Sequence, residues 1–464
     1  MSVRTRRYNS GALITRTCTA ASRKHAGILW PVVEGALIAL LGVACTRAGS
    51  APTPTPFVPL PEATATHAPS PRPATLTPSP TAQPVTPTET PTPVTTPLPT
   101  LVAGSPVLMR SIHMVDTSVG WGIGGYEGAS DHVLYTFDGG RSWRDVTPPE
   151  PEPQEAGTAK SAIGAFLDAS RGWVIYSSPN PYEQIGLTTV WGTDDGGLTW
   201  RGGSPLDITG LDIFIPKFIG FSGDKDGWLL IDLGAGMMHE YVALYTTHDG
   251  GRRWNRELDP YSPAPIQGCD KTGLTFIDAD AGWMTRDCHG VVEGLSLEST
   301  LDGGQTWISL PLLPPASEPG AFDFPNLCWV HSPRLFSQYR GALAVSCQQY
   351  DETRANTDNP WTNKRGYLYR TDDGGGSWSI RAAPPGTIEF ITEDVAFSFD
   401  RTISITEDGG GRWEPVKVVA WDGQFSFVDD RSGWAVAQSD GVTALVITTN
   451  GGKTWQEVHP LVQP

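Results

Sequence analysis

The feature that most constrains the fold is an octapeptide that recurs seven times. Each copy fits Thr-x-Asp/Asn-Gly-Gly-x-x-Trp, and successive copies lie 35 to 71 residues apart. A repeat with a period of this size predicts stacked units, because each unit must bury its apolar face against the next. The copies are TFDGGRSW (136–143), TDDGGLTW (193–200), THDGGRRW (247–254), TLDGGQTW (300–307), TDDGGGSW (371–378), TEDGGGRW (406–413) and TTNGGKTW (448–455).

A second motif, Phe-x-Asp-x-x-x-Gly-Trp, precedes the octapeptide in most units. We expect one strand to end at the Phe and the next to begin at Gly-Trp, with a third ending at the octapeptide Thr and a fourth beginning at its Trp. Four short antiparallel strands per unit predict an all-β, seven-bladed β-propeller over residues 101–464. The copies are FLDASRGW (166–173), FSGDKDGW (221–228), FIDADAGW (276–283), FVDDRSGW (427–434), the variant MVDTSVGW (114–121), and the degenerate LFSQYRGA (335–342) and FITEDVAF (390–397).

The octapeptide has the chemistry of a turn. Its Asp can accept hydrogen bonds from its own turn, its glycines can adopt positive φ, and its Trp can be buried between sheets. Asn450 keeps the acceptor without the charge, a change that a catalytic carboxylate or cation ligand would tolerate poorly. The spaced ligands of a calcium loop and the signature of a phosphate loop are absent. The residues given this structural role are Asp138, Asp195, Asp249, Asp302, Asp373, Asp408, Asn450, Trp143, Trp200, Trp254, Trp307, Trp378, Trp413 and Trp455.

The octapeptide resembles the Asp-box (BNR) repeat of sialidases, xyloglucanases and sortilin-type receptors. The whole unit most resembles the photosystem II assembly and stability factor family, which implies the propeller fold and a scaffold or chaperone-like role. That family carries a basic arginine patch, whereas residues 101–464 hold a charge of −22: the chain totals −17, residues 1–50 contribute +6 and residues 51–100 contribute −1. A domain this acidic would repel phosphate backbones, which argues against a nucleic acid partner.

The first hundred residues are typical of an export signal and a stalk. A basic stretch leads into GALIALLGVAC, which resembles a bacterial lipoprotein box with Cys45 as the lipidated residue. The alternatives are ordinary cleavage near Ala44 and an anchor that is not cleaved. The stretch 51–100 contains 16 Pro and 14 Thr, a composition that cannot form a packed core. We therefore expect a signal and anchor segment (1–45), a disordered stalk (46–100) and an extracytoplasmic, lipid-anchored monomer, with secretion as the alternative.

Four cysteines lie within the repeats. Cys269 and Cys288 are 19 residues apart, as are Cys328 and Cys347, and each pair flanks the first turn of its unit. Neighbouring antiparallel strands can bring such residues within bonding distance, so the sequence predicts disulfides 269–288 and 328–347, with buried free thiols as the alternative.

The resemblance to sialidases raises the alternative of a glycoside hydrolase. Sialidases use an Arg triad, a Tyr nucleophile paired with Glu, and an acid/base Asp, and their early Phe-Arg-Ile-Pro motif is absent; the nearest string, FIP at 214–216, lacks the Arg. A pair of facing carboxylates could still hydrolyse a glycoside. With 50 acidic residues, spacing nominates no pair, and we assign no catalytic residue, cofactor or metal.

The favoured hypothesis is a non-catalytic platform that binds a protein or glycan through its variable loops. Turns between strands one and two and strands three and four share one face of a propeller, and the remaining connections line the other. The longest of these, 348–367 in unit five, is rich in residue types that dominate interfaces, although a solvated insertion is the alternative. The candidate binding residues are Tyr350, Asp351, Arg354, Trp361, Lys364 and Arg365, together with Tyr261 in the connection after unit three.

Overall fold

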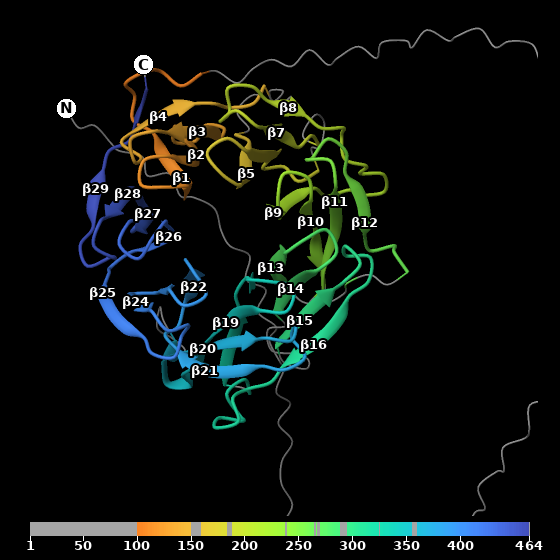
Figure 1. Cartoon of the computed structure of the whole chain (residues 1–464), viewed down its shortest axis with the longest axis vertical. Coiled ribbons are helices and arrows are strands. Elements are labelled where there is room, and N and C mark those ends of the chain that lie inside the picture. Colours follow the sequence, from red (N-terminus) through yellow and green to blue (C-terminus); the bar gives the residue numbers. More distant parts are fainter. Residues whose placement is uncertain are drawn as a thin grey trace, which may run out of the picture. The chain divides into compact units, whose positions relative to one another are not determined.

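The chain forms a ring of seven antiparallel sheets (Figure 1). The computed structural model describes residues 100–463 apart from 150–158, 183–187, 237–238, 264–265, 267–269, 288–294, 324 and 355–359. In each sheet the first strand of the unit lies toward the centre of the ring and the fourth toward its outside (Figure 1). The predicted fold, a seven-bladed β-propeller, is confirmed. The predicted signal segment 1–45 and residues 46–99 of the predicted stalk 46–100 lie outside the described residues.

The first four blades follow the chain in order. Blade 1 has β1 (Leu108–Met114), β2 (Gly120–Gly125), β3 (His132–Thr136) and β4 (Ser142–Asp145), and blade 2 has β5 (Ser161–Phe166), β6 (Gly172–Ser177), β7 (Trp191–Thr193) and β8 (Arg201–Gly202). Blade 3 has β9 (Ile215–Phe221), β10 (Gly227–Gly236), β11 (His239–Thr247) and β12 (Asn255–Leu258), and blade 4 has β13 (Asp270–Phe276), β14 (Gly282–Asp287), β15 (Leu295–Thr300) and β16 (Ile308–Leu312).

The last three blades complete the ring. Blade 5 has β17 (Asn326–Val330), the short β18 (Arg334–Leu335), β19 (Gly341–Tyr350), the 3₁₀ turn η1 (Glu352–Arg354), β20 (Trp361–Thr371) and β21 (Ser379–Ala383). Blade 6 has β22 (Thr387–Phe390), β23 (Ala396–Phe399), β24 (Thr402–Thr406) and β25 (Glu414–Val418), and blade 7 has β26 (Asp422–Phe427), β27 (Gly433–Ser439), β28 (Val442–Thr448) and β29 (Gln456–Val458). A final strand, β30 (Leu461–Val462), pairs with blade 1.

The Phe and Gly-Trp motif packs blades 1, 2 and 3 against the blades that follow them. Trp121 of blade 1 stacks on Phe166 of blade 2 with ring centroids 4.9 Å apart, and Trp173 of blade 2 stacks on Phe221 of blade 3 at 3.6 Å. Each Phe also covers the motif glycine of its own blade, where an added Cβ would lie 2.5–2.7 Å from the ring at residues 172, 227, 282 and 433. The motif therefore needs Gly for close approach, and its Trp and Phe meet across a blade boundary.

The ring closes through the C-terminal segment, which adds a fifth strand to blade 1. Strand β30 runs parallel to β4, with Leu461 paired to Ser142 and Val462 to Trp143. On its other side, Val462 exchanges backbone hydrogen bonds with Gly104 and Ser105, each 2.9 Å long. The chain segment before β1 thus holds β30 from one side and β4 holds it from the other.

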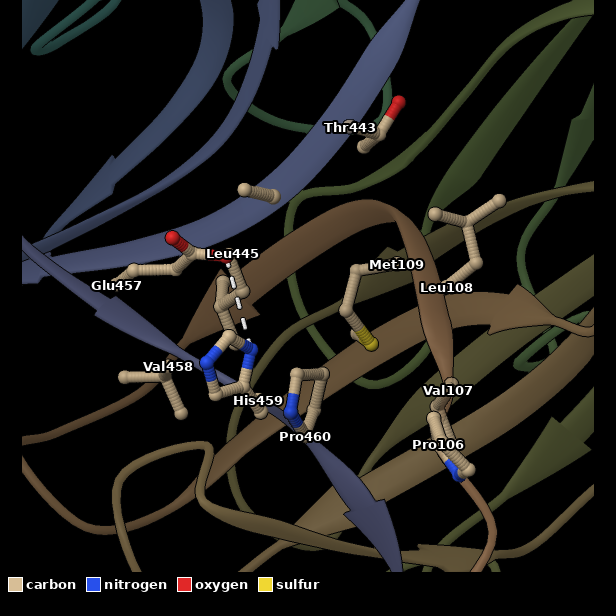
Figure 2. A pocket seen from close by; sticks show the side chains of 11 residues that line it. Pro106, Val107, Leu108, Met109, Thr443, Leu445, Glu457, Val458, His459 and Pro460 are labelled. Carbon is tan, nitrogen blue, oxygen red and sulfur yellow. Dashed lines mark ion pairs between the residues drawn. The ribbon is translucent and has the colours of Figure 1, made fainter.

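Blades 1 and 7 also pack directly at this closure. Trp434 of blade 7 donates its indole N–H to the Gly139 carbonyl of blade 1 at 2.9 Å, and both blades contribute to one apolar cluster around Trp143. A pocket of about 140 Å³ lies beside the closure, between the starts of β1 and β28 and the end of β29 (Figure 2). His459 and Glu457 form an ion pair on its rim, 3.6 Å apart (Figure 2).

Candidate functional site

The face that carries the octapeptides, which we call the box face, is built from seven internally bonded turns. In every copy the Asp or Asn oxygen accepts a hydrogen bond from the Thr hydroxyl two residues earlier, at 2.7–3.1 Å. The same oxygen accepts the backbone N–H four residues later, at 2.8–3.0 Å. Both glycines of every copy have φ between 69° and 94°. These acceptors are therefore engaged by their own turn.

Each octapeptide also joins the two turns of its blade. The N–H of its first glycine donates to a carbonyl in the turn between the first two strands, at 2.8–3.0 Å in all seven blades. Hydrogen bonds from Ser377 and Thr371 lower the pKa of Asp373 to about 2, so this carboxylate stays ionised in its turn at neutral pH. Among the octapeptide tryptophans, Trp143 and Trp254 are buried and the other five are half-buried.

The opposite face, which we call the loop face, carries the predicted binding segment of blade 5, and there the prediction of one long loop is wrong. Strands β19 and β20 extend into it, with Gln349 paired to Thr362 and Tyr350 to Trp361. The Tyr350 and Trp361 rings meet edge to face, with centroids 5.2 Å apart. Cross-strand aromatic pairs stabilise a ladder, so the segment is a β-hairpin whose connection spans only residues 351–360.

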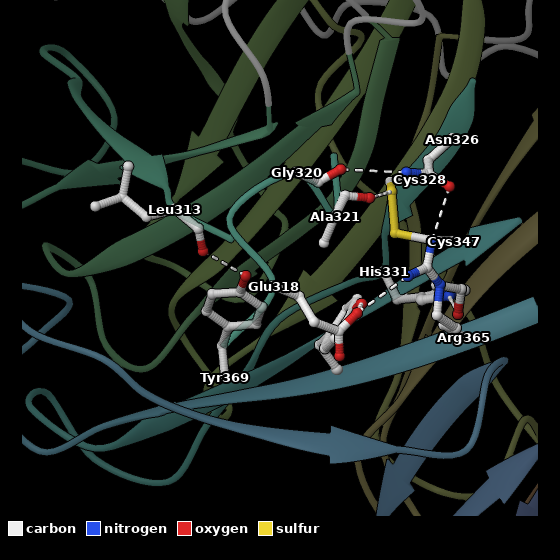
Figure 3. The surroundings of a disulfide bond; sticks show 12 residues. Leu313, Glu318, Gly320, Ala321, Asn326, Cys328, His331, Cys347, Arg365 and Tyr369 are labelled. Carbon is white, nitrogen blue, oxygen red and sulfur yellow. Dashed lines mark hydrogen bonds and ion pairs between the residues drawn. A yellow bond between two sulfur atoms is a disulfide. The ribbon is translucent and has the colours of Figure 1, made fainter. Parts of the chain in front are cut away.

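The polar residues of this hairpin are held by different neighbours. Lys364 forms an ion pair with Asp400 of blade 6 at 2.8 Å. Arg365 forms an ion pair with Glu318 at 3.0 Å and donates to the Asn326 side chain at 2.8 Å (Figure 3). Asp351 accepts hydrogen bonds from Thr353, which lower its pKa, and Arg354 is exposed in η1.

A disulfide joins the base of the hairpin to the inner strand of blade 5. Cys328 on β17 and Cys347 on β19 are register partners and are bonded to each other, as predicted (Figure 3). Both are buried in the cluster that contains Tyr367 and Tyr369. Cys269 and Cys288 lie outside the described residues, but Asp270 and Asp287, one residue inside them, are register partners.

Exposed tyrosines lie in the loop-face connections of blades 2 and 3. Tyr261 is 81% exposed, and the structure adds Tyr182, 68% exposed in the connection after β6, and Tyr241, 43% exposed at the start of β11. Pro181 accepts a hydrogen bond from Phe214, the residue before β9, so Tyr182 lies near blade 3. The sequence analysis did not select Tyr182 and Tyr241 as candidates, although each is a tyrosine within a connection of the variable face.

Several ionisable groups have strongly shifted pKa values, but most are enclosed. Burial lowers the pKa of Lys271 to about 8, and burial and Asp270 raise that of Asp287 to about 7. These side chains are 0% and 2% exposed, so a dissolved substrate cannot reach them. Glu389 on the inner strand β22 differs, because its side chain is half-buried and keeps some exposure to solvent, although desolvation of its carboxyl group by the surrounding protein raises its pKa to about 7. No cluster of three His, Cys, Asp or Glu suited to a metal occurs in the described ranges.

The chain is thus a seven-bladed propeller. The octapeptides join the two turns of each blade on the box face, and the variable connections form the loop face. No family model and no curated protein matches the sequence. Among solved structures, YCF48 bound to D1 peptide is 18% identical (TM-score 0.45; 76% of this chain and 95% of that chain covered), and YCF48 from Cyanidioschyzon merolae is 13% identical (0.42; 78% and 99%). The GH74 xyloglucanase from Xanthomonas campestris is 14% identical (0.34; 76% and 64%). Similarity at this level concerns the fold alone.

Proposed function

We propose that this protein is a non-catalytic, extracytoplasmic binding platform that presents its loop face to a protein or glycan partner. The observation that carries the proposal is the group of exposed tyrosines Tyr182, Tyr241 and Tyr261 on the connections of blades 2 and 3. Tyrosine offers a large amphipathic contact area at a small cost in conformational entropy, and it is enriched at interfaces and their hot spots. The proposal includes a scaffold role similar to that of an assembly factor with Asp-box repeats.

The blade 5 hairpin extends the same face. Because Lys364 and Arg365 are already held by ion pairs, they lose less conformational freedom on binding than free side chains would. The formed disulfide between Cys328 and Cys347 is compatible with an oxidising compartment. The structure describes no helix long and apolar enough to cross a bilayer. Anchoring through a lipid on Cys45 and a monomeric state are parts of the proposal.

A glycoside hydrolase is the second candidate, and Glu389 is the observation in its favour. A carboxyl group with a pKa near 7 could act as a general acid at neutral pH. A hydrolase would also need a second carboxylate about 5–10 Å away. The charged group that influences the pKa of Glu389 is Arg334, a cation that lowers it, and not the second carboxylate that a hydrolase requires.

The test compares loop-face and box-face variants of the full chain. We expect Tyr182→Ala/Tyr261→Ala to reduce capture of extracytoplasmic proteins or arrayed glycans at least about tenfold, a typical hot-spot loss. The matched control Phe137→Ala/Leu198→Ala removes two exposed box-face side chains and should leave capture unchanged.

Three outcomes would contradict the platform. Equal capture by the loop-face variant and wild type would reject the tyrosine surface, and no capture by wild type would reject binding. Release of reducing sugar from xyloglucan or of sialic acid from a sialoside, lost in Glu389→Gln, would establish the hydrolase.

A further inference from the structure

The seventh octapeptide contains an Asn–Gly pair, Asn450 and Gly451, which is the only such pair in the sequence. Asn–Gly is the dipeptide at which spontaneous deamidation proceeds most readily. The backbone nitrogen after the Asn attacks the side-chain amide, and glycine has no Cβ to obstruct the attack. The six other copies carry Asp–Gly at these two positions and have no amide to lose. The seventh turn therefore differs from its equivalents in chemical reactivity as well as in charge.

Deamidation at this pair takes two steps. The Gly451 nitrogen forms a bond to Cγ of Asn450 and gives up its proton, while Nδ2 leaves as ammonia, so that the two residues form a succinimide ring. Water then opens either carbonyl of the ring and leaves an aspartyl or an isoaspartyl residue at position 450. Water is the co-reactant, and no oxidation or reduction takes place.

In the folded turn the attacking nitrogen is already engaged. The Gly451 N–H donates to the Arg431 carbonyl at 2.8 Å, in the turn between β26 and β27, and Gly451 is buried. An added Cβ at Gly451 would lie 2.7 Å from the Asp430 carbonyl oxygen, so the backbone of the seventh octapeptide is packed against that turn. Attack on Cγ would break the hydrogen bond that joins the two turns of blade 7.

The side chain that would be attacked is held as well. Oδ1 of Asn450 accepts the Thr448 hydroxyl and the Thr454 N–H, both at 3.0 Å, and Nδ2 donates to the Thr454 hydroxyl at 2.8 Å. Both polar atoms of the amide are thus bonded within the turn, and rotation of the side chain toward the Gly451 nitrogen would break these bonds. The two reacting groups are released together when the turn opens.

We propose that Asn450 is a deamidation site that the folded seventh turn protects and that reacts when blade 7 opens. The two products differ in their ability to refold. An aspartyl residue is what the six other turns contain, and it supplies the same acceptor oxygen. An isoaspartyl residue adds a methylene to the main chain and shortens the side chain, so it cannot place one oxygen against both Thr448 and Thr454. The site lies on the box face and is independent of the loop-face proposal.

The test incubates the full chain at mildly alkaline pH, either folded in buffer or unfolded in urea, and follows the peptide that contains position 450 by mass spectrometry. We expect deamidation of the folded protein to be at least about tenfold slower, because an opening that costs about 1.4 kcal/mol already reduces the open population tenfold. After removal of the urea, the folded fraction should be depleted of the isoaspartyl form. An isoaspartyl content equal to that of the unfolded sample would contradict the role assigned to the turn.

Two threonine variants separate a local effect from a general loss of stability. Thr454→Ala removes the exposed hydroxyl that holds Nδ2 of Asn450, and it should accelerate deamidation of the folded protein several-fold. Thr199→Ala is the matched control, because Thr199 makes the equivalent bond to Asp195 in blade 2, and it should leave the rate at Asn450 unchanged.

Three results would overturn the proposal. Equal rates in the folded and unfolded wild type would show that the turn gives no protection, and an unreactive unfolded chain would show that position 450 is not a deamidation site. An unchanged rate in Thr454→Ala, or equal acceleration by both variants, would show that the bonds of the seventh turn are not what protects Asn450.

Discussion

At the scale of single residues, the octapeptide carboxylates are acceptors with a fixed geometry. Asn450 makes the same bonds as the six aspartates, accepting the Thr448 hydroxyl at 3.0 Å and the Thr454 N–H at 3.0 Å. Because the amide of Asn450 replaces the carboxylate without changing the turn, the structural role of this position depends on the oxygen that accepts the hydrogen bonds and does not require a charge. The sequence contained that information at position 450. It contained none for Arg370, whose guanidinium lies over the rings of Phe336 and Phe390 and donates to the Gly409 carbonyl at 2.9 Å, because an Arg that compensates for Ala342 at the Trp position lies outside both motifs.

A prediction at this scale concerns Asp138, which accepts bonds from Thr136, Arg141 and Ser142. We expect Asp138→Ala to lower the free energy of unfolding by about 2 kcal/mol, since bonds to a charged acceptor contribute about 1.5–3 kcal/mol. Asp138→Asn should cost less than about 1 kcal/mol, because it keeps the acceptor. Urea unfolding of the three proteins at pH 7 measures both, and equal costs for Ala and Asn would show that the hydrogen bonds contribute nothing.

The same residue predicts a pH dependence. Burial alone raises the pKa of Asp138, but hydrogen bonds from Ser142, Thr136 and Arg141 outweigh it, and the pKa lies below its ordinary value. A lowered pKa stabilises the fold above the pKa of the unfolded chain, about 3.9, and this contribution is lost as the pH falls through the folded-state value. The stability difference between wild type and Asp138→Asn should therefore begin to shrink as the pH falls below about 4 and disappear only below the folded-state pKa of Asp138. A difference that is unchanged at pH 3 would contradict the assigned ionisation.

At the scale of elements, motif spacing predicted the strand order and the position of both turns in each blade. It could not predict which side chains meet, because periodicity identifies apolar positions and leaves their partners open. The structure pairs the Trp of one blade with the Phe of the next. The 348–367 segment was misjudged because its charges are typical of a loop, whereas the Tyr350–Trp361 contact and the ion pairs of Lys364 and Arg365 allow the ladder to continue.

The second disulfide, between Cys269 and Cys288, is the prediction at this scale. The neighbouring residues Asp270 and Asp287 are register partners, as Cys328 and Cys347 are in blade 5, so the two strands are aligned for the bond. Mass spectrometry of peptides from the unreduced protein should show 269–288 and 328–347 linkages. Alkylation of either cysteine of the first pair without prior reduction would contradict the prediction, and the 328–347 peptide serves as the internal control.

At the scale of the whole molecule, stability depends on how the ring is closed. The two motifs assign four strands to every unit and contain no signal for a further strand that closes the ring. The structure closes the ring with β30, which is held between residues 104–107 and β4. The hydrogen bonds that hold β30 are formed by backbone groups, which leave no pattern of side chains in the sequence. Composition and motif spacing therefore could not predict this strand.

Deletion of residues 460–464 should therefore destabilise the entire propeller. It removes five backbone hydrogen bonds, through Pro460, Leu461, Val462 and Gln463, and uncovers the site of the buried Val462. At about 1 kcal/mol per bond and about 2 kcal/mol for the side chain, the loss is about 7 kcal/mol, comparable with the stability of a typical domain. We expect the truncated chain to unfold or oligomerise at 25 °C by circular dichroism and gel filtration. The control Val462→Ala should stay folded with a lower thermal midpoint, because it keeps the backbone bonds. A truncated chain that melts like wild type would show that the direct contacts between blades 1 and 7, including the Trp434–Gly139 bond and the apolar cluster around Trp143, close the ring without β30.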